Sequence, residues 1–149
     1  MIKRVYSLPM ILAVAFAFLF IFSPQMGKSE SLRTITLPSG EKVCDLNGEW
    51  NAVYENYGGE CARWGTLKSI LQIKQQGNKF VAIKLSGGGT LSKGDEVIRG
   101  ELDQKGLKKI EYFQTGWRLW AECKGEITDG CKKIMFENVG CTKATLERK

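Results

Sequence analysis

Hydrophobic and polar residues alternate with a period of two along most of the chain from residue 48 onward. Near the C-terminus, Ala144 and Leu146 share one face. The intervening Lys143, Thr145 and Glu147 take the other face. Such alternation is typical of a half-buried strand, because successive side chains point to opposite sides. The pattern predicts eight short strands, at residues 49–55, 67–75, 79–85, 96–103, 108–114, 119–127, 131–137 and 142–148.

Glycine-containing turns separate these strands, and no proline follows Pro38. Residues 100–110 (GELDQKGLKKI) and 125–134 (GEITDGCKKI) repeat one pattern of strand end, turn and strand start. The Asp129-Gly130 pair is a strong hairpin signal. We therefore expect an all-β domain, an eight-stranded antiparallel up-and-down meander that closes into a small barrel and so leaves no exposed edge. An open sheet or a two-sheet sandwich of the same strands is the alternative.

The connections between the expected strands alternate in length. The tight turns lie at 76–78, 104–106 and 128–130, and the long connections at 56–66, 86–95 and 115–118. An up-and-down order places each set at its own end of the barrel, which predicts a cup with a closed base and an open mouth. An eight-stranded barrel is just wide enough to be filled by its own side chains or to hold one small ligand.

Aromatic residues gather in the connections at the expected mouth. Tyr57, Trp64 and Trp117 lie in them, Trp120 lies just inside the strand that follows, and Arg63 adjoins Trp64. Aromatic rings beside a cation are suited to an apolar or planar ligand, or to a protein partner. These five residues are the predicted ligand-binding set. The alternative is that the aromatic rings cap the core of the barrel itself.

The N-terminal segment has the two main features of a secretory signal. Lys3 and Arg4 precede an uncharged apolar stretch at 8–22. We expect residues 1–31 to be a signal peptide, 32–47 an extended lead-in and 48–149 the barrel, with a periplasmic or secreted location. The alternative is an uncleaved signal anchor that holds the protein in the inner membrane through residues 5–22.

Composition and charge narrow the chemistry. The chain has no histidine, which excludes Ser-His-Asp and Cys-His catalysis and His-ligated metal sites. The five cysteines include no C-x-x-C pair, which disfavours a zinc or redox site. The net charge of +6 is interspersed rather than clustered, which is not typical of a nucleic-acid-binding protein. We expect no enzyme activity, no cofactor, no metal, no nucleic-acid partner and no membrane contact beyond the N-terminal segment.

The start of the first expected strand and the end of the last meet at the closed end of the barrel and carry a characteristic set of residues. Gly48-Glu49-Trp50 opens the first strand, and Arg148 closes the last. This combination resembles the calycin superfamily, which includes lipocalins, fatty-acid-binding proteins and avidins. In lipocalins a Gly-x-Trp motif begins the first strand, and a basic residue from the last part of the barrel packs over the tryptophan. The resemblance implies that Trp50 closes the base beneath Arg148 and that a cavity opens at the other end.

The strand order also assigns the cysteines to ends of the barrel. Cys44 and Cys131 fall at the closed end, and Cys61 and Cys141 at the mouth, whereas Cys123 lies in the middle of a strand. The order therefore predicts the bridges Cys44–Cys131 and Cys61–Cys141. A local Cys131–Cys141 bridge is the alternative, because four cysteines allow three connectivities.

Two function classes follow from this fold. The first is an exported lipocalin-like protein that binds a small apolar or aromatic ligand at the barrel mouth. The second is a filled barrel that acts as a protein-binding, structural or inhibitory module of the cell envelope, with an envelope protein as its partner. Small inward residues would leave room for a ligand: Ser69, Gly100, Ala121, Cys123, Gly125 and Ala144. A filled interior would bring together Trp50, Tyr54, Tyr112 and Phe136. The short strands favour a mostly filled interior with binding at the mouth.

Overall fold

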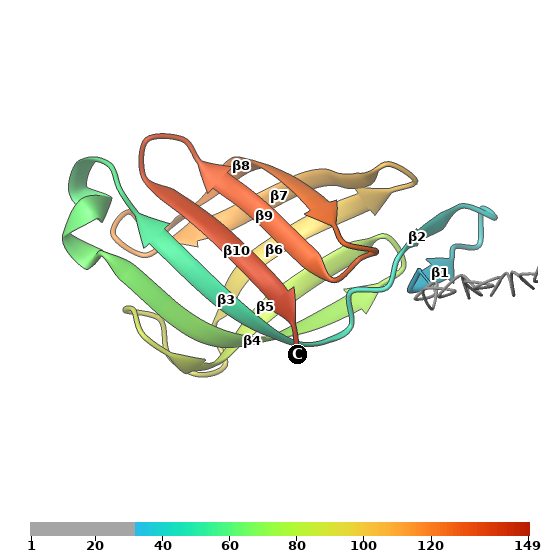
Figure 1. Cartoon of the computed structure of the whole chain (residues 1–149), viewed down its shortest axis with the longest axis horizontal. Helices are drawn as coiled ribbons and strands as arrows, with labels where there is room; N and C mark the ends of the chain where they lie inside the picture. The colour runs from blue at the N-terminus through green and yellow to red at the C-terminus, as the bar shows by residue number, and fades with distance from the viewer. Residues whose placement is uncertain (1–31) are drawn as a thin grey trace, which may run out of the picture.

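The computed structural model describes residues 32–149, and these residues form an all-β protein (Figure 1). The barrel strands are β3 (Gly48–Asn56), β4 (Thr66–Gln76), β5 (Lys79–Gly87), β6 (Glu96–Asp103), β7 (Gly106–Gln114), β8 (Leu119–Thr128), β9 (Lys133–Asn138) and β10 (Thr142–Arg148). Each pairs antiparallel with its neighbour in the chain, and β10 pairs with β3, from Thr142 opposite Asn56 to Arg148 opposite Trp50. The predicted eight-stranded up-and-down barrel is therefore confirmed, and the open sheet and the sandwich are excluded. The expected signal peptide, or signal anchor, lies outside the described residues.

Two segments contain short elements that the sequence pattern does not predict. Residues 32–47, expected to be an extended lead-in, contain a hairpin of β1 (Thr34–Thr36) and β2 (Lys42–Cys44), whose turn is closed by Gly40 N–H donating to Leu37 O at 2.8 Å. The connection between β3 and β4 contains a six-residue 3-10 helix, η1 (Gly59–Trp64). Neither element is long enough to produce a clear periodicity. Within residues 32–149, no helix has the length and apolar character needed to cross a lipid bilayer.

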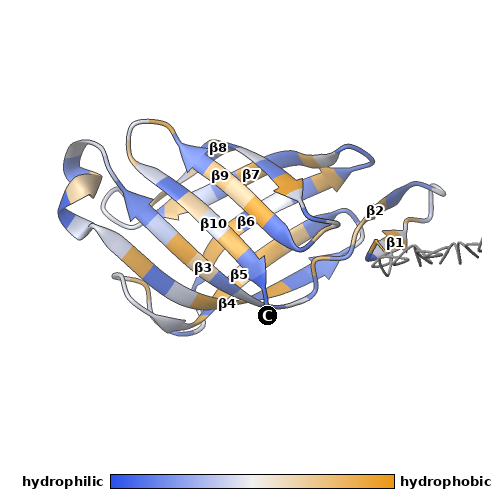
Figure 2. Cartoon of the chain, viewed as in Figure 1, coloured by the Kyte–Doolittle hydropathy of each residue, from blue (hydrophilic) through white to orange (hydrophobic). Residues whose placement is uncertain are grey.

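The alternation of hydrophobic and polar residues along the strands is visible in Figure 2. It places one set of side chains inside the barrel and the other in solvent. The alternation is broken between β5 and β6, where the register shifts at Ala82/Ile83 and both Val97 and Ile98 are buried. A bulge of this kind re-aims the side chains on one strand relative to its neighbour.

The part of the barrel next to its closed end is filled by side chains. Its fully buried side chains include Trp50, Leu71, Ile73, Leu102, Ile110, Ile134 and Leu146. A ligand carrier would need empty space at small inward residues such as Gly100 and Gly125. The structure leaves no such space at either glycine. A Cβ at Gly100 would lie 2.7 Å from the ring of Phe80, and one at Gly125 would lie 3.0 Å from Cβ of Phe136. Neither glycine has room for a side chain, because backbone oxygens of Lys109 and Met135 and the side chains of Phe80 and Phe136 lie against them.

Arg148 and Trp50 close the base together. The guanidinium carbon of Arg148 lies 4.7 Å from the centre of the indole ring, and the indole N–H donates to Leu46 O at 2.9 Å. Arg148 also donates to Asn47 O at 2.5 Å and to Asp45 O. Gly48 fits beneath this side chain, since its φ is +130° and an added Cβ would lie 3.2 Å from Arg148 Nη1. The last strand thereby holds the segment that leads into the first.

The β1–β2 hairpin is joined to this closed end by covalent and polar contacts. Cys44 forms a disulfide with Cys131, with the two Cα atoms 5.5 Å apart. The side-chain amide of Gln75 accepts from Leu46 N–H at 2.7 Å and donates to Cys44 O at 2.9 Å. Figure 1 places the hairpin at one end of the molecule and η1 at the other. Within residues 32–149, the hairpin therefore lies over the closed end and not over the end that contains η1.

Candidate ligand site at the barrel mouth

The mouth of the barrel contains a cavity of about 200 Å³. The inner faces of the strands form its floor, through Tyr54, Ser69, Lys84 and Tyr112. The three long connections form its rim, as the alternation of loop lengths predicts. Sites for drug-sized ligands run from about 300 to 1,000 Å³, so this cavity suits a smaller molecule.

The cavity is where the barrel buries its polar groups. Among the described residues, the polar or charged side chains classed as buried are Ser69, Lys84 and Thr142, and all three line the cavity. Buried polar groups are unfavourable unless they are hydrogen-bonded. Their concentration around one cavity, above a filled apolar base, indicates that this interior surface is arranged for something other than packing.

Lys84 is the buried charge of the site. Its side chain is about 5% exposed, and its ammonium donates to Gly88 O and Leu91 O, each at 2.7 Å. Both acceptors belong to the β5–β6 connection, which therefore folds around the lysine. The same connection is linked to the β7–β8 turn, where Thr90 Oγ1 lies 2.7 Å from Thr115 Oγ1. The lysine thus fixes one side of the mouth.

Tyr54 supplies a second polar group to the floor. Its hydroxyl is buried and has no hydrogen-bond partner within the described part of the chain. Burial raises the pKa of Tyr54 far above its usual value, with a smaller contribution from Tyr112, so the hydroxyl is a neutral donor. The two tyrosine rings lie 5.8 Å apart, and Tyr112 lies 5.8 Å from Phe136. This group of rings separates the cavity from the packed base.

Two tryptophans stand at the rim. Trp64 is 46% exposed and Trp117 is 67% exposed, and both line the cavity. Arg63 lies with its guanidinium carbon 5.3 Å from the centre of the Trp64 ring, and it pairs with Glu60 at 3.6 Å. The exposure of the rings indicates that they are available for contact rather than engaged in capping the core.

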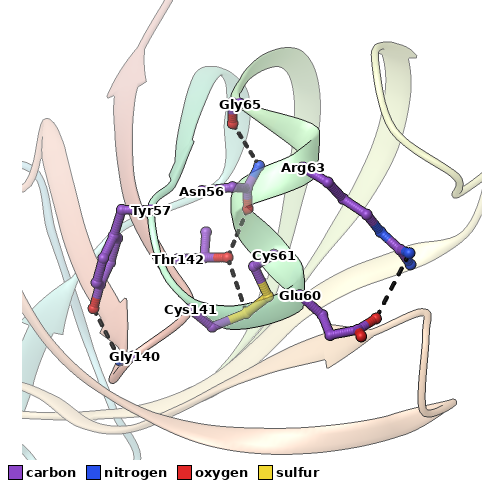
Figure 3. Close-up of a disulfide and its surroundings, with 9 residues drawn as sticks. All are labelled: Asn56, Tyr57, Glu60, Cys61, Arg63, Gly65, Gly140, Cys141 and Thr142. Carbon is purple, nitrogen blue, oxygen red and sulfur yellow. Dashed lines mark hydrogen bonds and ion pairs between the residues drawn. A yellow bond between two sulfur atoms is a disulfide. The ribbon is translucent and has the colours of Figure 1, made fainter.

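The side of the mouth that carries η1 is held by a disulfide and by Asn56 (Figure 3). Cys61, in η1, is bonded to Cys141, which precedes β10, with Cα atoms 5.3 Å apart. The Asn56 amide donates to Gly65 O at 2.8 Å, and its oxygen accepts from Thr142 Oγ1 at 2.7 Å. A rim that is fixed in this way loses little freedom when a ligand binds.

Two of the five predicted ligand-binding residues lie elsewhere. The Tyr57 hydroxyl donates to Glu137 at 2.6 Å and accepts from Gly140 N–H at 3.0 Å, and the bond to Glu137 raises the pKa of Tyr57. Trp120 faces outward, because its neighbour Ala121 pairs with the inward Tyr112. Neither residue lines the cavity. Arg63, Trp64 and Trp117 do line it.

The Trp120 side chain packs against other residues on the outer face of the barrel. Its ring lies 5.3 Å from Phe113 and 4.3 Å from the guanidinium carbon of Arg99. Arg99 in turn donates to Glu111 at 2.8 Å, which lowers the pKa of that carboxyl group. The tryptophan therefore belongs to a polar-aromatic cluster on the outer face of the barrel.

Sequence reasoning placed Tyr54, Ser69 and Tyr112 inside the barrel but missed Lys84. In β5, Val81, Ile83 and Leu85 form the more hydrophobic of two alternating sets, so the pattern favours them as the inward set. The structure instead buries Phe80, Ala82 and Lys84. Lys84 lies on the same face of the strand as Phe80, and this was the only indication in the sequence that the lysine points inward. Which face of β5 is inward is set by its pairing with β4 and β6.

Comparison of the chain with protein-family models, with curated proteins and with solved structures gives no match in any of the three. Fold and site thus define its class: a small, closed, antiparallel β-barrel with two disulfides, a form compatible with a binding or structural module.

Proposed function

We propose that this protein is an exported, lipocalin-like barrel that binds a small organic molecule at its mouth and does no catalysis. The observation that carries the proposal is the cavity of about 200 Å³ with a polar floor and a tryptophan rim. Such a combination of apolar walls and a few convergent polar groups is typical of small-molecule sites. The absence of histidine from the sequence favours binding over acid–base chemistry.

Export is the second part of the proposal. Two disulfides join segments 87 and 80 residues apart in the sequence, and such bonds persist in oxidising compartments. The basic and apolar start of the chain supports the same location, as the periplasm or the cell exterior.

A fragment screen tests the binding proposal. We would record ligand-observed NMR for a panel of small aromatic compounds, neutral, cationic and anionic, and confirm hits by calorimetry. Trp64→Ala and Trp117→Ala should each weaken binding about tenfold or more. Both side chains are well exposed, so the free energy of unfolding should change by only about 0.5 kcal/mol.

Trp120→Ala is the matched control, because it removes a tryptophan from the outer face near the same end of the barrel. It should leave the affinity for the same fragments unchanged. Equal losses in all three variants, or no fragment binding at all, would refute the cavity as a ligand site.

The native mass of the protein recovered from the envelope of its own host gives an independent test. Additional mass that disappears on denaturation would support a bound ligand, and its value would begin to identify the molecule. The covalent mass would also report whether the N-terminal segment is removed.

A protein-binding role is the second candidate, and the exposed apolar side chains near the mouth favour it. Trp117, Leu119 and Val139 are 67%, 45% and 69% exposed. Aromatic and aliphatic residues that remain in solvent are common in surfaces that bind other proteins. A bare native mass together with an empty fragment screen would favour this role over ligand binding.

A further inference from the structure

We propose that the ligand carries a carboxylate on a small aromatic body, and that this group binds the Lys84 ammonium and the Tyr54 hydroxyl on the cavity floor. The inference rests on the proposed function of the cavity as a ligand site and adds the chemical class of the ligand.

The first argument is the incomplete coordination of Lys84. An ammonium group has three donors, and two of them are used by the carbonyl groups of Gly88 and Leu91. Both acceptors are neutral, so the positive charge is hydrogen-bonded but not balanced. A charge buried to this degree is normally paired with an opposite one.

The second argument is the charge around the cavity. Its charged lining residues are Lys84, Arg63 and Glu60. The Glu60 carboxylate is 80% exposed and already pairs with Arg63 at the rim. No carboxylate in residues 32–149 forms an ion pair with Lys84. The interior of the site is therefore positive, which favours an anion and disfavours a cation.

The third argument is the Tyr54 hydroxyl. It is buried without a partner among the described residues, and Tyr54 is one of the residues that line the same cavity. A neutral phenol donates one hydrogen bond, and a buried donor with no acceptor is unfavourable by about 1–3 kcal/mol. A carboxylate has two oxygens and accepts from several donors at once. In the proposed complex, one such group accepts from both the tyrosine and the lysine.

The size and rim of the cavity set the rest of the ligand. A volume of about 200 Å³ limits the body to about one or two rings. Trp64 and Trp117 at the rim offer indole faces, on which a planar ring stacks well. A molecule of the size of cinnamate matches these features.

Lys84 has a competing explanation, which is that it only holds the β5–β6 connection through Gly88 and Leu91. The two explanations differ in what the lysine does to ligand charge. A lysine that only holds the loop affects acids and neutral analogues alike. A lysine that binds the carboxylate discriminates between them.

The experiment compares acids with their primary amides at pH 7. Trans-cinnamate and trans-cinnamamide have nearly the same shape and differ in charge, and the benzoate, naphthoate and indole-acetate pairs extend the comparison. By calorimetry or NMR titration, we expect the unaltered protein to bind the acid at least tenfold more tightly than the amide. Lys84→Met should remove this preference by weakening acid binding about tenfold or more, with little effect on the amide.

Two further variants complete the design. Tyr54→Phe keeps the ring and removes the donor, so acid binding should weaken severalfold while the fold is retained. Lys68→Met removes one positive charge from an exposed position on the neighbouring β4 and should leave the preference intact. The acid-to-amide ratio of the unaltered protein requires no variant, so the test stands even if Lys84→Met does not fold.

The outcomes separate the two proposals. Equal binding of acid and amide, or an acid preference that persists in Lys84→Met, would overturn the carboxylate assignment and leave the cavity as a ligand site. Binding of amides in preference to acids would do the same. If neither member of any pair binds, both the cavity function and this inference fail.

Discussion

Replacement of Arg148 by methionine tests how the closed end of the barrel is held. Methionine keeps an unbranched apolar stem over the Trp50 ring and removes the guanidinium. The change therefore deletes the hydrogen bonds to Asn47 O and Asp45 O and the cation–π contact at 4.7 Å.

The magnitude follows from these contacts. A hydrogen bond that involves a charged group contributes about 1.5–3 kcal/mol, and the lower value applies because the arginine is partly exposed. The cation–π contact adds about 0.5–1 kcal/mol. Arg148 Nε is buried without a partner in the described chain, and its removal offsets about 1 kcal/mol. We expect Arg148→Met to lower the free energy of unfolding by about 2.5–3 kcal/mol.

Urea denaturation of the oxidised protein measures this change, with the m-value as the check that the unfolding transition is otherwise unaltered. Arg148→Lys should recover about half of the loss, since it keeps the charge but not the forked geometry. Lys105→Met, at an exposed turn, is the control for loss of one positive charge. If Arg148→Met lies within about 0.5 kcal/mol of the unaltered protein, the guanidinium does not hold the base.

Three other variants or treatments probe the interior, the inward thiol and the mouth. Burial raises the pKa of Cys123 to about 11, so its thiol keeps its proton at pH 8. The rate of iodoacetamide labelling, followed by mass spectrometry, should therefore rise about tenfold per pH unit up to pH 10. A plateau in that rate near pH 9 would contradict the raised pKa. Gly125→Ala should lower the free energy of unfolding by about 1–3 kcal/mol, because the new Cβ meets Phe136, and an unchanged thermal midpoint would contradict that packing. Replacing both Cys61 and Cys141 by serine opens an 80-residue loop and should lower the free energy of unfolding by about 4–5 kcal/mol, with weaker fragment binding than the unaltered protein.

The strands were predictable because local sequence sets them. Alternation with a period of two, the Asp129-Gly130 turn and the spacing of the connections are all short-range signals. Closure was predicted because a closed barrel leaves no exposed edge strand. The observed bridges Cys44–Cys131 and Cys61–Cys141 match the pairing predicted from that order, since it determines which end each cysteine occupies.

The site was only partly predictable, because side-chain direction depends on register. Trp120 is one residue from an inward position, and a shift of one residue moves a side chain to the other face. Lys84 was obscured by the more hydrophobic residues beside it, which lie on the outer face. The rim residues Trp64 and Trp117 lie in connections, where loop position alone brings them to the mouth.

The two ends of the barrel differ in how their interiors are filled. Between the ring of Tyr112 and the closed end, the interior is apolar and filled. Arg148 and the β1–β2 hairpin hold the closed end together. Toward the mouth, the interior includes buried polar groups, and the Tyr54 hydroxyl has no hydrogen-bond partner among the described residues. A barrel that used its whole interior for packing would have no reason to place a lysine and an unpaired hydroxyl together at one end. Substitutions at the base should therefore change the free energy of unfolding with little effect on ligand preference, whereas Lys84→Met should change the preference for acids over amides.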